Sequence, residues 1–200
     1  MKKFELTTEF ITNFLGTKLF RIKALVEFGK VEKGELGGFV EKEENLDHDG
    51  DAWVSGDAMV YGNARVYGNA EVYGDAEVYG NARVSGDAMV YGNARVSGNA
   101  RVYGNAWVSG NARVSGDAWV SGDQMYAAVK GFGSEYRNTT FFITKDGNVC
   151  VNCGCFSGTL EQFREKVEET HKDTKYAKEY LMIADLMEMH FKEELEKIKK

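Results

Sequence analysis

The stretch from residue 51 to residue 122 reads DAWVSG (51–56), DAMVYG (57–62), NARVYG (63–68), NAEVYG (69–74), DAEVYG (75–80), NARVSG (81–86), DAMVYG (87–92), NARVSG (93–98), NARVYG (99–104), NAWVSG (105–110), NARVSG (111–116) and DAWVSG (117–122). These are twelve copies, without an insertion, of one six-residue unit, in which an Asn or Asp is followed by Ala, a variable residue, Val, a Tyr or Ser, and Gly. Units that recur at a fixed period pack against their equivalents along one axis. The stretch therefore predicts a repeat architecture.

Each unit divides into a short strand and a corner. Side chains alternate along a strand, so the invariant Ala and Val share the buried face, and the variable residue and the Tyr or Ser face outward. Gly followed by Asn or Asp is turn chemistry, because these residues tolerate the left-handed backbone region best. A two-residue corner cannot cross over a sheet. Each strand must therefore pair with its equivalent one coil later, as in a solenoid.

The order Val, Tyr/Ser, Gly, Asn/Asp, Ala resembles the hexapeptide repeat of left-handed parallel β-helices. The resemblance implies that three hexads form one triangular coil, that the helix is left-handed, and that the protein is a homotrimer. Twelve hexads then give about four coils. We expect a mainly β protein, with a left-handed parallel β-helix capped by a small N-terminal α/β segment and by a C-terminal β-hairpin with two helices.

Three parts follow from this pattern: an N-terminal cap (1–45), the β-helix (46–123) and a C-terminal α+β domain (124–200). In the cap, residues 19–25 and 35–41 are predicted strands. Val40 and Leu46 share the six-residue phase of Ala52, so we expect an irregular first coil to begin near residue 36.

The C-terminal part changes from six-residue units to ordinary elements. Residues 139–144 and 148–153 predict a hairpin around Lys145-Asp146-Gly147. Thr159 and Gln162 form a capping-box pattern at the start of a helix, and a second helix is predicted over about 175–198. Its apolar stripe is expected to pack on the hairpin within the chain, and the alternative is that it meets copies of itself. The stripe consists of Ala184, Met187, Phe191, Leu195 and Ile198.

Composition excludes several classes of protein. Lys and Arg number 25 against 31 Asp and Glu, a formal net charge of -6, which argues against double-stranded nucleic acid as a partner. No apolar run approaches the roughly 18–20 residues of a membrane span, and Glu5 and Glu9 interrupt the N-terminus where a signal peptide would be apolar. Three cysteines are too few for a disulfide scaffold, so a reducing cytoplasm is expected.

The order of segments also carries a resemblance. RIKAL (21–25), LGGFVEKEENL (36–46), the repeats, GCFSGTLEQF (154–163) and KYAKEYL (175–181) together resemble a protein family found in phages and Firmicutes genomes. The resemblance implies a phage or prophage setting and, for a phage protein, the host-cell cytoplasm. It implies no activity. In such a setting the partner could be a host protein, including a defence protein that is inhibited, or a signalling nucleotide.

Enzymatic chemistry has little support in the residues. Many hexapeptide-repeat proteins are acyltransferases with a histidine base near a loop, but His48, His171 and His190 all lie outside the repeats, and no loop interrupts them. An acyltransferase-like enzyme is therefore the alternative to the leading interpretation, and a virion or structural role is the third. We predict no enzymatic activity.

No metal or cofactor is expected. Cys150, Cys153 and Cys155 lack a nearby fourth ligand for zinc, which favours buried structural thiols over a zinc site or a regulatory disulfide. The aspartates of the corners are scattered among asparagines, and calcium needs six to eight converging oxygens. The Asn and Asp side chains of the corners could form ladders from coil to coil, but they are not expected to bind calcium, and the corners are predicted to be solvated turns.

The outward variable positions fall into three columns if three hexads make one coil. They are Trp53, Glu71, Met89 and Trp107 in the first column, Met59, Glu77, Arg95 and Arg113 in the second, and Arg65, Arg83, Arg101 and Trp119 in the third. Like charges at neighbouring strand positions repel, so the third column predicts an acidic partner, phosphates or solvent against it.

The leading interpretation is a non-enzymatic binding or assembly protein built on a rigid, self-associating β-helix. We expect the partner or anionic ligand to contact Arg65, Arg83, Arg101, Trp119, Tyr67 and Tyr103. We expect the oligomer interface to contain Trp53, Met89, Trp107, Tyr73 and Tyr91, which lie on the most apolar face.

Overall fold

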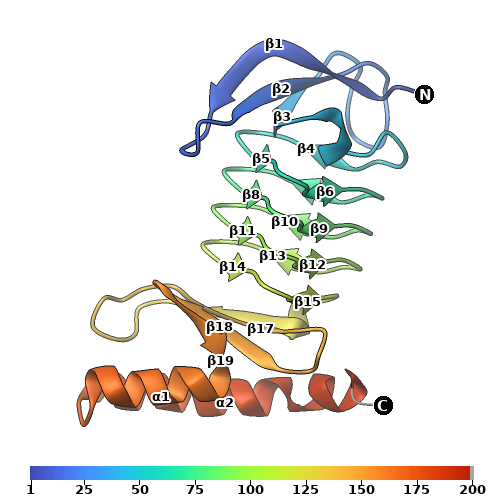
Figure 1. Cartoon of the computed structure of the whole chain (residues 1–200). Coiled ribbons are helices and arrows are strands. Elements are labelled where there is room, and N and C mark those ends of the chain that lie inside the picture. Colours follow the sequence, from blue (N-terminus) through green and yellow to red (C-terminus); the bar gives the residue numbers. More distant parts are fainter. Residues whose placement is uncertain (199–200) are drawn as a thin grey trace.

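The computed structural model describes residues 1–198. It shows a column of stacked coils, with a β-structure at its N-terminal end and a sheet backed by two helices at its C-terminal end (Figure 1). The protein is a mainly β solenoid of about five turns with parallel, stacked coils. No helix within the described residues is both long enough and apolar enough to cross a membrane.

Each hexad contributes one short strand. The strands stack in parallel into three sheets, in the orders β4-β7-β10-β13, β5-β8-β11-β14 and β6-β9-β12-β15. Every strand therefore pairs with its equivalent three hexads along the chain, as predicted. The strands are β4 (Trp53–Val54), β5 (Met59–Val60), β6 (Arg65–Val66), β7 (Glu71–Val72), β8 (Glu77–Val78), β9 (Arg83–Val84), β10 (Met89–Val90), β11 (Arg95–Val96), β12 (Arg101–Val102), β13 (Trp107–Val108), β14 (Arg113–Val114) and β15 (Trp119–Val120).

The core of the solenoid is the stack of invariant Ala and Val side chains. Each repeat Val, from Val54 to Val120, has no exposed surface, and each repeat Ala, from Ala52 to Ala118, is at most 1% exposed. Burial of a Val side chain contributes about 1.5–2 kcal/mol. The prediction that the two invariant positions face inward is confirmed.

An irregular coil precedes the repeats and contains the 3-10 helix η1 (Glu43–Asn45). Strand β3 (Leu36–Val40) pairs in parallel with β5, with Val40 opposite Val60, and Leu46 bridges to Val66. This coil is longer than three hexads, because the segment between Leu46 and Val54 exceeds one hexad. The predicted irregular first coil is therefore present and begins at Leu36, but Val40 and Leu46 stack on the Val positions and not on the Ala positions whose sequence phase they share.

The N-terminal part is a β-hairpin. Strands β1 (Phe4–Thr12) and β2 (Lys18–Ala24) pair in antiparallel fashion, and β2 pairs in the same way with β3. The hairpin thus extends one solenoid sheet to the order β1-β2-β3-β5-β8-β11-β14. Where we expected an α/β segment, residues 1–50 contain strands and a single 3-10 turn.

The C-terminal part is an antiparallel sheet backed by two helices (Figure 1). The sheet order is β16 (Tyr126–Val129), β17 (Thr139–Ile143), β18 (Val149–Cys153) and β19 (Phe156–Thr159). The predicted hairpin is its β17–β18 pair. The 3-10 helix η2 (Asp123–Met125) links the last coil to β16, and β17 contacts both β14 and β15. The sheet therefore covers the open end of the solenoid.

Both predicted helices are present, as α1 (Leu160–His171) and α2 (Lys175–Ile198). The Thr159 hydroxyl accepts a hydrogen bond from the Gln162 backbone N–H, and the Gln162 side chain accepts one from the Thr159 N–H, which confirms the capping box. Ala184, Met187 and Phe191 of the predicted stripe are buried within the chain.

The hydrogen-bond ladder of the coils has a prevailing direction. In each regular hexad the Asn or Asp, the variable residue and the Tyr or Ser donate their backbone N–H to carbonyls of the next coil, as Trp53 does to Ala70 and Arg83 to Ala100. The first coil therefore presents mainly carbonyls without a partner from the ladder, and the last coil presents N–H groups together with some carbonyls. Both sets need partners from outside the ladder if they are buried.

Side chains of matching polarity cover the carbonyl end. The Lys3 ammonium donates to the carbonyls of Gly50 at 3.1 Å and Ala52 at 2.9 Å, and burial lowers the pKa of Lys3. The buried Asn45 amide donates to the carbonyls of Gly62 at 3.2 Å and Ala64 at 2.8 Å. Donors thus close the end that exposes acceptors.

At the opposite end the C-terminal part supplies both donors and acceptors. The Tyr126 hydroxyl donates to the Trp107 carbonyl, and the Asn152 amide donates to the Arg113 carbonyl at 2.8 Å. The Asp123 carboxylate accepts a hydrogen bond of 2.7 Å from the Trp107 N–H, and the Thr140 hydroxyl accepts one of 3.0 Å from the Arg113 N–H. A cation and an anion therefore stand at the two ends of the ladder, each against backbone groups of opposite partial charge.

Candidate ligand-binding groove

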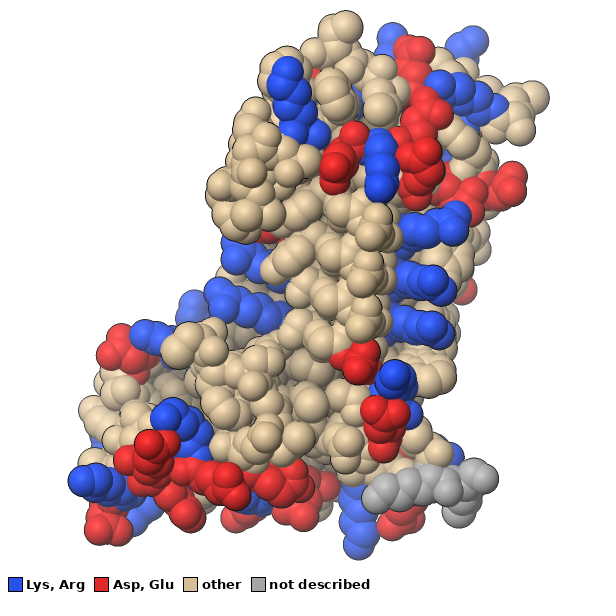
Figure 2. All heavy atoms as spheres, in the orientation of Figure 1, with Lys and Arg blue, Asp and Glu red and all other residues tan. Residues whose placement is uncertain are grey.

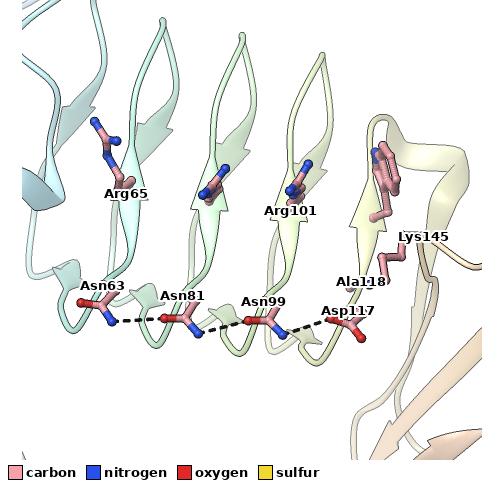
Figure 3. A pocket seen from close by; sticks show the side chains of 10 residues that line it. Asn63, Arg65, Asn81, Asn99, Arg101, Asp117, Ala118 and Lys145 are labelled. Carbon is pink, nitrogen blue, oxygen red and sulfur yellow. Dashed lines mark hydrogen bonds between the residues drawn. The ribbon is translucent and has the colours of Figure 1, made fainter.

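The third column of outward side chains contains an arginine column, defined as Arg65, Arg83 and Arg101. These residues lie in register on the sheet β6-β9-β12-β15, and Trp119 continues the column on the last coil. Neighbouring strands are about 4.8 Å apart, so the three arginines are stacked at that interval on the outside of the solenoid (Figure 3).

A row of hydrogen-bonded side chains runs beside the arginine column, at the neighbouring corner of the coils (Figure 3). The Asn63 amide donates to Asn81 at 3.2 Å, Asn81 donates to Asn99 at 3.1 Å, and Asn99 donates to Asp117 at 3.1 Å. We call these four residues the asparagine row. Each bond uses one amide N–H of its donor, so each Asn keeps a second N–H for another partner.

The arginine column and the asparagine row line one groove of about 470 Å³, together with Ala118, Trp119 and Lys145. Trp119 lies at one end, where the Arg101 guanidinium is 5.8 Å from its ring. Lys145 reaches this end from the turn between β17 and β18. At the other end, Arg65 lies 3.9 Å from the Asp47 carboxylate.

The charges of the groove are poorly offset within the chain. No ion pair joins Arg83 or Arg101 to a carboxylate within residues 1–198. In the second column, by contrast, Arg95 lies 2.8 Å from the Glu77 carboxylate. A space-filling view shows basic side chains stacked along the solenoid without acidic neighbours between them (Figure 2). The groove is therefore a site of concentrated positive charge.

The second column shows how the chain offsets such charge elsewhere. Glu77 is largely buried, and it also accepts a hydrogen bond of 3.1 Å from the Tyr61 hydroxyl. Burial and the nearby Glu77 carboxylate raise the pKa of Tyr61, which keeps the phenol protonated and able to donate. The pair of Glu77 and Arg95 is thus internally satisfied, whereas Arg83 and Arg101 are not.

The structure divides the predicted ligand-binding residues. Arg65, Arg83, Arg101 and Trp119 line one groove, but Tyr67 and Tyr103 do not line it. Tyr103 packs near Trp119, with ring centroids 6.1 Å apart, and lines a separate cavity of about 430 Å³ beside the end of α2.

Sequence reasoning missed the other wall of the groove. Asn63, Asn81 and Asn99 are exposed, as expected for solvated turns, and they also form the ladder that such corners could form, but the sequence did not indicate that this ladder borders a groove. Their regular spacing of three hexads is the signal that could have identified them. Lys145 carried no such signal, because it comes from a different part of the chain.

The predicted oligomer face is altered at its first residue. Trp53, Glu71, Met89 and Trp107 do lie in register. Trp53, however, is 5% exposed and packs against Phe28, with ring centroids 5.4 Å apart. Trp53 is therefore a core residue of the chain and not part of a surface for another subunit.

The rest of that face is partly exposed. Trp107 is 49% exposed, and the rings of Tyr73 and Tyr91 stack on each other with centroids 4.9 Å apart. Glu71 separates Trp53 from Met89 in the column. The apolar part of this face is thus confined to the later coils.

The cysteines and histidines have other surroundings. Cys150 and Cys153 are partly buried, Cys155 is exposed, and burial raises the pKa of the Cys150 thiol. Among residues 1–198, no three His, Cys, Asp or Glu side chains gather as they would around a metal ion. The Nδ1 atom of His48 accepts a hydrogen bond from the Lys3 N–H, so His48 lies against the N-terminal hairpin.

One family model matches the chain. The YdcK beta solenoid repeat matches residues 52–68, 60–74, 76–92, 82–97, 94–110 and 106–122. These residues all lie in the coils, and the matches support a β-solenoid repeat protein. The N-terminal and C-terminal parts are outside the matched residues. No curated protein matches the sequence significantly.

Proposed function

We propose that this β-solenoid protein is a non-enzymatic binding protein that holds an elongated anionic ligand in the groove between the arginine column and the asparagine row. The observation that supports this proposal is the pair of stacked arginines, Arg83 and Arg101, which lack a carboxylate partner within residues 1–198. Like charges on neighbouring strands cost free energy, and a ligand with several anionic groups offsets that cost.

The chemistry of the two walls suits oxyanions. A guanidinium presents five N–H donors in a planar fork that matches carboxylate or phosphate. The second amide N–H groups of Asn63, Asn81 and Asn99 supply neutral donors at the same interval. A ligand whose anionic groups follow one another along the column can therefore contact several coils at once.

Trp119 makes the two ends of the groove different. Its indole ring lies at one end and offers an apolar face next to Arg101 and Lys145. A ligand with a flat ring at one end and anionic groups along its length, such as a nucleotide, fits this order of groups. An acidic protein segment fits the column but uses Trp119 only for packing.

The biological setting is also part of the proposal. On the resemblance in segment order, we propose that the protein acts in a phage or prophage setting and in the host cytoplasm. The ligand there is a host protein or a small anion, and inhibition of host defence is one role. Assembly of the solenoid into a homotrimer rests on the hexapeptide-repeat resemblance alone.

The test is a binding titration with inorganic tripolyphosphate, measured by calorimetry on the full-length protein at low and high salt. We expect Arg83→Ala and Arg101→Ala each to weaken binding by about 1–3 kcal/mol, as is usual for a charge-assisted contact. The melting temperature should stay nearly unchanged, because both side chains are exposed.

Arg113→Ala is the matched control, since it removes an arginine from the same strand position of the second column. It should leave the affinity for tripolyphosphate unchanged. Equal losses in Arg83→Ala and Arg113→Ala would show that only net charge matters. An unchanged affinity in the triple variant of Arg65, Arg83 and Arg101 would refute the groove as the site.

A further inference from the structure

Helix α2 carries a second apolar stripe that faces away from the protein. Met182, Leu186 and Met189 are 72%, 49% and 66% exposed. Their spacing of four and three positions places them on one line along the helix. Ala184, Met187 and Phe191 of the predicted stripe are buried on a different side of the helix. The outward stripe therefore has no role in the core of this chain.

Charged side chains flank the outward stripe in a particular order. Lys175 and Lys178 precede it and Glu193 and Glu196 follow it, and all four are exposed. At about 100° per residue, the four lie on the same side of the helix as the stripe. No ion pair involves any of the four within residues 1–198.

We propose that α2 binds α2 of a second copy of this chain, in antiparallel orientation about a twofold axis between Asp185 and Leu186. In this arrangement Met182 of one copy lies opposite Met189 of the other. Lys178 lies opposite Glu193, and Lys175 lies opposite Glu196. Because the interface is isologous, each of these contacts forms twice.

The charge order selects a second copy in this orientation. A basic half followed by an acidic half is complementary to its own reverse, whereas a parallel pair of the same helices would place like charges together. Methionine side chains are flexible enough to pack against each other across such a pair. No residue that lines the groove belongs to α2, so the dimer is independent of ligand binding.

The size of the surface sets the expected strength. A helix of 24 residues is about 36 Å long. One pair of such helices buries less than a standard interface of about 1,600 Å². We therefore expect a reversible dimer with a dissociation constant of about 1–100 μM, and a monomer at lower concentrations.

The first experiment is sedimentation velocity on the full-length protein, across about 1–100 μM. Wild type should shift from monomer to dimer. Leu186→Glu should remain monomeric, because it places two carboxylates at the axis. Its melting temperature and circular dichroism should match wild type, since Leu186 is exposed. Phe14→Glu, at the exposed tip of the N-terminal hairpin, is the control and should dimerise normally.

The second experiment is a charge exchange. Lys178→Glu and Glu193→Lys should each weaken the dimer about fivefold or more, and the double variant should restore it, because the two residues face each other only in the antiparallel pair. A wild type that stays monomeric, or a double variant weaker than both single variants, would overturn the proposal. So would a dimer that Trp107→Glu breaks and Leu186→Glu does not.

Discussion

At the scale of single residues, the corners of the coils depend on glycine for two separate reasons. The corner glycines have positive φ, for example +68° at Gly98 and +65° at Gly116. At Gly98 the corner also lies directly against the next coil, where an added Cβ would be 2.8 Å from the Gly116 nitrogen. At Gly116 an added Cβ would meet nothing within 4 Å.

This pair separates backbone strain from steric contact. We expect Gly116→Ala to cost about 1–2 kcal/mol of unfolding free energy, because a residue with a Cβ is strained in the left-handed region. Gly98→Ala should cost about 1–3 kcal/mol more, since backbone must also move. Denaturant unfolding of both variants measures the difference. Equal losses of unfolding free energy in the two variants would show that the close contact between coils at Gly98 adds no cost of its own.

At the scale of elements, the parallel strands place equivalent residues of successive coils next to each other, so the same side-chain contact recurs from coil to coil. The three sheets place like residues next to each other, which stacks Val in the core, Arg on one outer face and Asn at one corner. This stacking of like side chains is unfavourable for the arginines and favourable for the asparagines. Amide groups can both donate and accept hydrogen bonds along a row, whereas guanidinium groups can only donate.

The asparagine row therefore contributes to stability. Asn81→Ala removes the two hydrogen bonds that Asn81 makes with Asn63 and Asn99, and should cost about 1 kcal/mol of unfolding free energy. Asn105→Ala is the control, because Asn105 is an exposed corner residue without a side-chain hydrogen bond within residues 1–198. It should change stability by less than about 0.5 kcal/mol. If chemical denaturation shows a larger loss of unfolding free energy for Asn105→Ala than for Asn81→Ala, the asparagine row does not stabilise the protein.

At the scale of the whole molecule, the two terminal parts close the ladder. The N-terminal part supplies mainly hydrogen-bond donors to the first coil, and the C-terminal part supplies both acceptors and donors to the last coil. Both parts also cover apolar side chains that a bare coil would expose to water. Solenoid stability is therefore a property of the complete chain as well as of the repeats.

Asn45 tests this arrangement at the carbonyl end. Asn45→Ala should cost about 2–3 kcal/mol, because it leaves the buried carbonyls of Gly62 and Ala64 without a donor. Asn45→Asp should cost more at neutral pH, because it sets a carboxylate against those carbonyls, although it still accepts from the Lys42 N–H. Thermal unfolding gives the order, and an Asn45→Asp variant as stable as wild type would refute the polarity argument.

The sequence by itself determined the elements whose partners are set by local spacing. The six-residue period identified the buried Ala and Val, and the resemblance to the hexapeptide repeat supplied the coil of three hexads and, with it, the composition of each outer column. The hairpin at residues 139–153, the capping box at Thr159 and helix α2 were also predictable, because turn residues, a cap and helical periodicity act within a few residues of one another.

Only the tertiary structure decided what lies against the ends and edges of the coils. Phe28 buries Trp53, the longer first coil shifts Val40 onto the Val stack, and Lys145 enters the groove from the β17–β18 turn. These contacts join residues that no periodic pattern relates. Each depends on how a segment outside the repeats docks on the solenoid, and docking is decided by the shapes and charges of whole surfaces.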